Sequence, residues 1–152
     1  QVAGRAGRGK EKGHVIIQTS NPEHYVIQHA LTHNYEAFYA DEIEFRKELK
    51  YPPFSDLIHI ICSGKINNQT KETIETLHSF IKKKTRSLEN SFCQIIGPKP
   101  APIEKIKDHF RWHMLIKTDS ETFQAIKQIL KYPPKTSHYV KVIIDYHPKT
   151  IL

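Results

Sequence analysis

The chain from residue 57 onward alternates between the spacing of apolar residues that is typical of strands and the spacing typical of helices. The resulting order, β-α-β-β-α-β, is that of a split βαβ unit, in which two helices pack on one face of an antiparallel sheet. We therefore expect an α+β domain. Strands are predicted at 57–62, 93–96, 111–117 and 139–146, and helices at 68–86 and about 120–130.

The residues before this domain have a different pattern. Tyr51-Pro52-Pro53-Phe54 ends a helical stretch, because proline cannot continue a helix and favours extended geometry in the residue before it. We place a domain boundary there, between residues 1–50 and 51–152. In the first part we expect a strand at 14–18, a helix from Pro22 to about Leu31, capped by Ser20 or Asn21, and a helix at 35–50.

The charge balance favours a polyanionic partner. Lys and Arg number 23 against 16 for Asp and Glu, which gives a net charge of +7. No apolar run approaches the roughly 20 residues that span a bilayer. Cys62 and Cys93, the two cysteines of the chain, are too few for an all-cysteine zinc site.

Several catalytic and metal motifs are incomplete. Residues 4–10, GRAGRGK, match part of a phosphate-binding loop, but Glu11 follows where Ser or Thr should bind Mg²⁺. His29 and His33 have the spacing of a zinc motif, yet Ala30 replaces its glutamate. A serine-hydrolase GxSxG motif is missing from the sequence. We predict no metal site in the chain and no catalytic residue from residue 51 on.

The stretch from Pro98 to Lys117 carries the candidate DNA contacts. Its prolines favour an extended path that displays lysines, and Phe110-Arg111-Trp112 places two aromatic rings around a guanidinium. Single-strand binding needs cations for the backbone and rings for base stacking. An alternative for the tryptophan is a core position beside Met114 and Ile116, and both interpretations stay open. The candidates are Lys99, Lys105, Lys107, Arg111 and Trp112.

The opening QVAGRAGRG resembles motif VI of superfamily 2 helicases, which lies in the second RecA-like lobe. Its combination with HVIIQT, with YEAFYADEIEFRKELKYPPFSDL and with IIGPKPAPIEKIKDHFRWHMLIK resembles the primosomal protein N′ family of bacterial replication-restart helicases. The resemblance covers essentially the whole chain. It implies that residues 1–50 are the end of the second RecA-like lobe, a strand and two helices, and that 51–152 are a C-terminal DNA- and partner-binding domain.

The resemblance also implies an ATP-dependent 3′ to 5′ DNA helicase that recognises stalled forks and restarts replication by primosome assembly. Arg5 and Arg8 match the arginine fingers of motif VI, and Gln1, Gly4 and Gly7 match its nucleotide-binding positions. These residues are expected to act only in the full-length enzyme, whose ATP with Mg²⁺ and structural zinc bind upstream of Gln1.

The expected partners are single-stranded and forked DNA, the single-strand-binding protein and primosome proteins. We expect a cytoplasmic monomer that acts at replication forks and has no membrane contact. Glu121 weakens a pocket for the acidic tail of the single-strand-binding protein on the predicted helix 120–130, although Lys127 and Lys131 are available. Two rival hypotheses are a stand-alone single-stranded nucleic-acid-binding module and a scaffold domain that binds proteins. A scaffold predicts an exposed apolar patch and a weak salt dependence of any DNA binding.

Overall fold

The computed structural model describes residues 14–86 and 91–149. The chain divides into two compact units, one ending at Ile43 and one beginning at Glu44. Within the described ranges, no helix is both long enough and apolar enough to cross a membrane. Arg5, Arg8, Gln1, Gly4 and Gly7 lie outside the described residues.

The first unit contains α1 (Tyr25–Leu31) and most of α2 (Tyr35–Glu48). Neither helix has a buried residue. The contacts within the unit are polar and aromatic: the Tyr25 hydroxyl donates a hydrogen bond to Glu42, and His29 Nε2 lies 2.7 Å from Asp41 Oδ2.

Two predictions for this unit are wrong. Residues 14–18 form no strand, since a strand needs a partner to pair its backbone groups and no described strand lies in this unit. Ile16 is accordingly 92% exposed. The cap of α1 is His24, whose Nδ1 accepts from the Val26 N–H at 3.3 Å, rather than Ser20 or Asn21.

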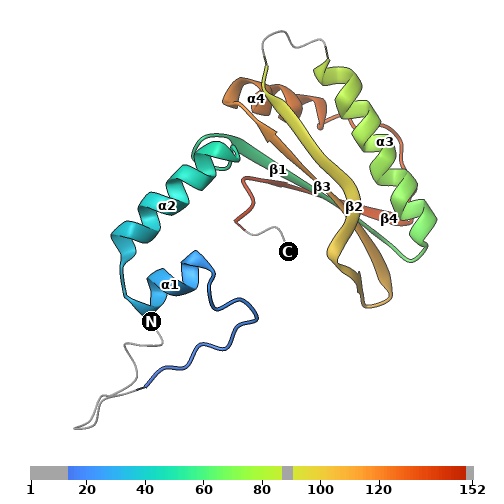
Figure 1. The fold of residues 1–152 in the computed structure, drawn as a ribbon. Helices are drawn as coiled ribbons and strands as arrows, with labels where there is room; N and C mark the ends of the chain where they lie inside the picture. The colour runs from blue at the N-terminus through green and yellow to red at the C-terminus, as the bar shows by residue number, and fades with distance from the viewer. Residues whose placement is uncertain (1–13, 87–90, 150–152) are drawn as a thin grey trace. The chain divides into compact units, whose positions relative to one another are not determined.

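The second unit is built on a four-stranded antiparallel sheet, with α3 and α4 on one face (Figure 1). The strand order is β2-β3-β1-β4, and consecutive neighbours all run antiparallel. The α+β fold with a βαββαβ unit is therefore confirmed. The elements are β1 (Asp56–Gly64), α3 (Asn67–Thr85), β2 (Cys93–Ile106), β3 (His109–Thr118), α4 (Ser120–Ile129) and β4 (Val140–Tyr146).

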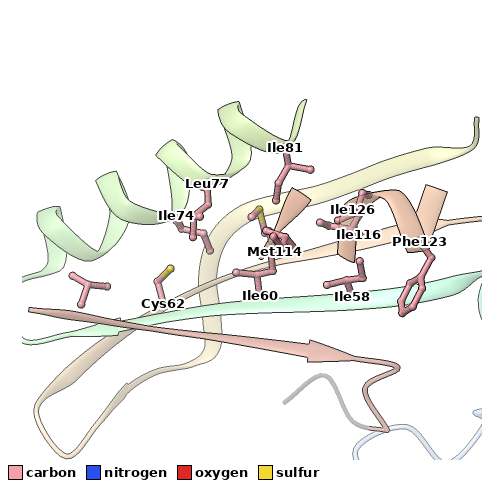
Figure 2. Close-up of a cluster of buried hydrophobic side chains, with 12 residues drawn as sticks. Ile58, Ile60, Cys62, Ile74, Leu77, Ile81, Met114, Ile116, Phe123 and Ile126 are labelled. Carbon is pink, nitrogen blue, oxygen red and sulfur yellow. The ribbon is translucent and has the colours of Figure 1, made fainter. Parts of the chain in front are cut away.

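The hydrophobic core lies between the sheet and the two helices (Figure 2). Alternate residues of a strand point to the same face, and residues three or four apart share a face of a helix, so both periodicities meet in one layer. Asp119 caps α4, with its Oδ1 accepting from the Thr122 N–H at 2.8 Å. The core is formed by Ile58, Ile60, Cys62, Ile74, Leu77, Ile81, Met114, Ile116, Phe123, Ile126, Leu130 and Val140.

β2 is longer than predicted, because it continues from residue 96 to Ile106 through Pro98, Pro100 and Pro102. Proline has no N–H for a sheet ladder, and it is tolerated here because β2 is an edge strand. The pairing with β3 shifts register twice, between Ile96 and Lys99 and between Pro100 and Lys105. Beyond the second shift, β2 and β3 form a hairpin arm, defined here as residues 103–110.

Candidate nucleic-acid interface

The face of the sheet opposite the helices carries the residues that alternate with the core. Residues directly paired across an antiparallel sheet share a face, so Ser63 of β1 lies between Arg111 of β3 and Lys141 of β4. Lys99 of β2 is paired with His113, two residues from Arg111. Neighbouring strands lie about 4.8 Å apart, so the three cations form a row across the sheet, from the edge strand β2 to the edge strand β4. We call Lys99, Arg111 and Lys141 the open-face strip.

The strip is accessible and partly ordered. Lys99 and Lys141 are exposed, and Arg111 is half-buried. The Arg111 Nη1 donates to the Ile103 carbonyl oxygen at 3.3 Å, which orients the guanidinium beside the hairpin arm. A group of cations on one sheet face, with one side chain held in place, suits an extended polyanion such as a nucleic-acid backbone.

The hairpin arm holds two more of the predicted DNA contacts, Lys105 and Lys107. Lys107 and Asp108 both have positive φ, 48° and 59°, as in the tight turn that best matches the twist of a two-stranded hairpin. Lys105 Nζ lies 3.0 Å from Asp108 Oδ1 and 5.1 Å from the centre of the Phe110 ring. Part of the positive charge of the arm is therefore balanced locally.

Trp112 lies on the helix-covered face of the sheet, apart from the open-face strip. Its side chain packs against the hydrophobic core, and its indole Nε1 donates to Asn67 Oδ1 at 2.8 Å. This packing favours the core alternative over stacking on a base. The strand alternation explains the separation, because adjacent residues of β3 point to opposite faces.

A buried pair of histidines, which the sequence did not single out as functional, lies next to the strip. His59 is 3% exposed and His113 is 4% exposed, and His59 Nε2 lies 2.9 Å from His113 Nδ1. Burial, followed by His59, Lys99 and Arg111, lowers the pKa of His113 to about 4. The pKa of His59 is also lowered, mainly by burial, although Asp145 opposes the shift.

The other end of the same face is closed by the segment that follows α2. Lys117 is 4% exposed, and its Nζ donates to the Leu49 carbonyl oxygen at 2.7 Å. The same ammonium lies 3.6 Å from the centre of the Tyr51 ring. Lys117 is therefore engaged in packing and is not part of the strip.

No group of three or more His, Cys, Asp or Glu side chains within ranges 14–86 and 91–149 has an arrangement that could hold a metal ion. His29 and His33 have the spacing of a metal motif, but His29 is hydrogen bonded to Asp41.

Comparison with known proteins assigns the domain. Residues 47–149 match the family model of the primosomal protein N C-terminal domain. The chain is 42% identical to the replication restart protein PriA of Synechocystis over 120 residues, 79% of this chain and 14% of the relative. It is 40% identical to that of Bacillus subtilis over 134 residues, 87% of this chain and 16% of the relative.

The similarity extends to more distant bacteria. The Haemophilus influenzae replication restart protein PriA is 30% identical over 120 residues, which are 79% of this chain and 16% of the relative. The matched part of the chain thus spans a small fraction of each of these relatives. By the family match and the identities together, the chain belongs to the replication restart protein PriA family and carries its C-terminal domain.

Proposed function

We propose that this domain binds single-stranded and forked DNA on the open face of its sheet, as the DNA-gripping part of a replication-restart helicase. The observation that carries the proposal is the open-face strip: Lys99, Arg111 and Lys141 come from three strands and share the face opposite α3 and α4. Lys105 and Lys107 on the hairpin arm would extend the contact beyond the sheet. Cations from several strands can follow a phosphate backbone without reading its sequence.

The family supplies the wider setting of this proposal. In the full-length protein, the domain would act beside an ATP- and Mg²⁺-dependent 3′ to 5′ motor with a structural zinc, in the bacterial cytoplasm. Arg5 and Arg8 would supply arginine fingers there, and Gln1, Gly4 and Gly7 would contact the nucleotide. The partners proposed for the whole protein are the single-strand-binding protein and the primosome proteins. Replication restart is the role that the names of the relatives support.

Fluorescence anisotropy of the full chain with labelled single-stranded, duplex and forked DNA tests the proposal. Each titration is run at several salt concentrations with Arg111→Ala and Lys141→Ala, and with Lys83→Ala on α3 as the matched control. Removing one phosphate contact to single-stranded DNA should flatten the slope of log affinity against log salt by about 0.7. We expect this change in both strip variants and an unchanged slope in the control.

Three results would argue against this function. Absence of binding to all three DNAs at low salt would leave protein docking as the better hypothesis for the domain. Binding that Lys83→Ala weakens as much as Arg111→Ala would place the contact on the helix side of the sheet. A salt slope near zero would favour the scaffold alternative.

A further inference from the structure

The buried histidine pair has one ring nitrogen without a hydrogen-bond partner, which is unusual for a buried polar group. The rings of His59 and His113 meet edge to face, with centroids 5.2 Å apart, and one hydrogen bond joins them. The second nitrogen of His113, Nε2, is buried and has no hydrogen-bond partner. Buried polar atoms are usually paired, so an unpaired imidazole nitrogen indicates a group that the site is built to receive.

The protons of the two rings limit what that group can be. A neutral histidine has one N–H and one acceptor nitrogen, and the bond between the rings uses a single proton. If His59 Nε2–H donates to His113 Nδ1, the remaining proton of His113 lies on Nε2. This nitrogen then needs an acceptor, such as an anionic oxygen.

The charges around His113 also favour an anion. Lys99 faces it from β2 and Arg111 lies two residues away on β3, and both lower its pKa. Asp145 of β4 is paired with His59 rather than with His113. Lys141 of β4 is paired with Ser63, at the end of the face where Arg111 lies. Two cations, Lys99 and Arg111, therefore act on His113, whereas the carboxylate of Asp145 lies on the His59 side of the pair and Lys141 lies farther away.

We propose that His113 Nε2, together with Lys99 and Arg111, forms a subsite for one phosphate of the bound DNA, and that the His59–His113 pair links its occupancy to proton uptake. This inference rests on the proposed function and adds a specific contact to it. Lys99 is exposed and Arg111 is half-buried, and both side chains are long enough to reorient toward a phosphate beside them. The phosphate oxygen accepts from Nε2–H, and this arrangement selects one tautomer in each ring.

The direction of the pH dependence follows from linkage. In the free protein the pKa of His113 is about 4, so its ring is neutral near pH 7. A phosphate beside the ring favours the protonated form and raises this pKa. The bound state therefore holds more protons than the free state over the interval between the two pKa values. Affinity should rise as the pH falls through the bound-state pKa, and should be constant at higher pH.

The first test measures the affinity for an oligo-dT probe by anisotropy between pH 5.5 and 8 at constant ionic strength. For the wild type we expect tighter binding at pH 5.5 than at pH 7.5, by about three- to tenfold. His113→Gln retains a side-chain N–H but cannot titrate in this range. It should therefore still bind the probe at pH 7.5, and its affinity should change less with pH than that of the wild type. His138→Gln, a change at an exposed loop residue, should retain the wild-type profile.

A His113→Leu variant and an NMR experiment separate this inference from a fault in folding and from the proposed function. His113→Leu should weaken binding at every pH with an unchanged unfolding midpoint or a higher one. Imidazole ¹⁵N spectra of the wild type, recorded with oligo-dT and separately with inorganic phosphate, should show a shift of His113 Nε2 with DNA. A shift of equal size with phosphate alone at the same concentration would show that the site takes free phosphate instead.

The outcomes are distinguishable. DNA binding with a pH profile that His113→Gln leaves unchanged, and with no shift of His113 Nε2, would overturn the phosphate subsite while the proposed function stands. Loss of all DNA binding in the wild type would overturn the proposed function itself, and the subsite as a DNA contact with it.

Discussion

The buried ammonium of Lys117 should be a measurable source of stability. Lys117→Met retains an unbranched side chain but removes the hydrogen bond to the Leu49 carbonyl and the contact with the Tyr51 ring. A hydrogen bond to a charged group contributes about 1.5–3 kcal/mol, and a desolvated cation–π contact contributes up to about 2 kcal/mol. The substitution also removes the cost of burying a charge, which offsets part of this sum.

We therefore expect Lys117→Met to lower the free energy of unfolding by about 2 kcal/mol, which is a decrease of about 1 M in the urea midpoint at typical slopes. Leu49 is 55% exposed, so water can bind its carbonyl oxygen and limit the loss. Trp112, the single tryptophan, packs against the core and can report unfolding by its fluorescence. Lys83→Met at an exposed position of α3 is the matched control.

The contribution of the ring can be measured separately by a double-mutant cycle with Tyr51→Leu. A coupling energy near zero would assign the stabilisation to the hydrogen bond alone. Equal or greater stability of Lys117→Met would refute the reasoning, because it would show that desolvation of the ammonium outweighs both contacts.

Three further predictions concern the same domain. Asp119→Ala removes the side chain that caps α4, which also accepts a hydrogen bond from the Phe92 N–H at 2.6 Å. The substitution should lower the free energy of unfolding, measured with urea, by about 1 kcal/mol. The pKa of Asp119 is lowered, chiefly by the Thr122 N–H, so its stabilisation is present above the unfolded-state pKa and is lost as the pH falls through the folded-state pKa. The variant should therefore lose less stability than the wild type on acidification below about pH 4. The same pH dependence of the free energy of unfolding in both proteins would contradict the capping role of Asp119. Cys62 is fully buried and its pKa is raised by burial to about 12, so a thiol reagent at pH 8 should modify it only at the rate of unfolding, as mass spectrometry can check. Gly64→Ala would place a methyl group 2.6 Å from Thr70 Oγ1 and should destabilise the domain by about 1–3 kcal/mol, whereas a wild-type melting temperature would show that α3 shifts freely.

The order of elements in the second unit could be predicted because it depends on local periodicity. Val140, Val142 and Ile144 on one strand and Ile74, Leu77 and Ile81 on one helix show, by their spacing alone, which side of each element is buried. The capping role of Asp119 is equally local, since its acceptor and the Thr122 N–H are three residues apart. The family resemblance also came from sequence alone, and the family match confirms it.

Local pattern failed where the outcome depends on a partner element. Residues 14–18 have the composition of a strand, but no described strand pairs with their backbone N–H and C=O groups. β2 continues through three prolines because it lies at the edge of the sheet. Its position in the strand order cannot be predicted from its own residues. Nothing in the sequence around Lys117 predicts that its side chain is buried. The burial depends on Leu49 and Tyr51, which are far from Lys117 in the chain.

The candidate site shows the same division. The sequence alone pointed to Lys99 and Arg111 as displayed cations, from prolines and aromatic neighbours close to them in the chain. Only the antiparallel register brought Lys141 beside them, and only the register joined His59 to His113, 54 positions away. Periodicity determines which way a side chain points within its own element, whereas the neighbours it meets on a sheet are determined by strand order and register, which depend on the packing of the whole domain.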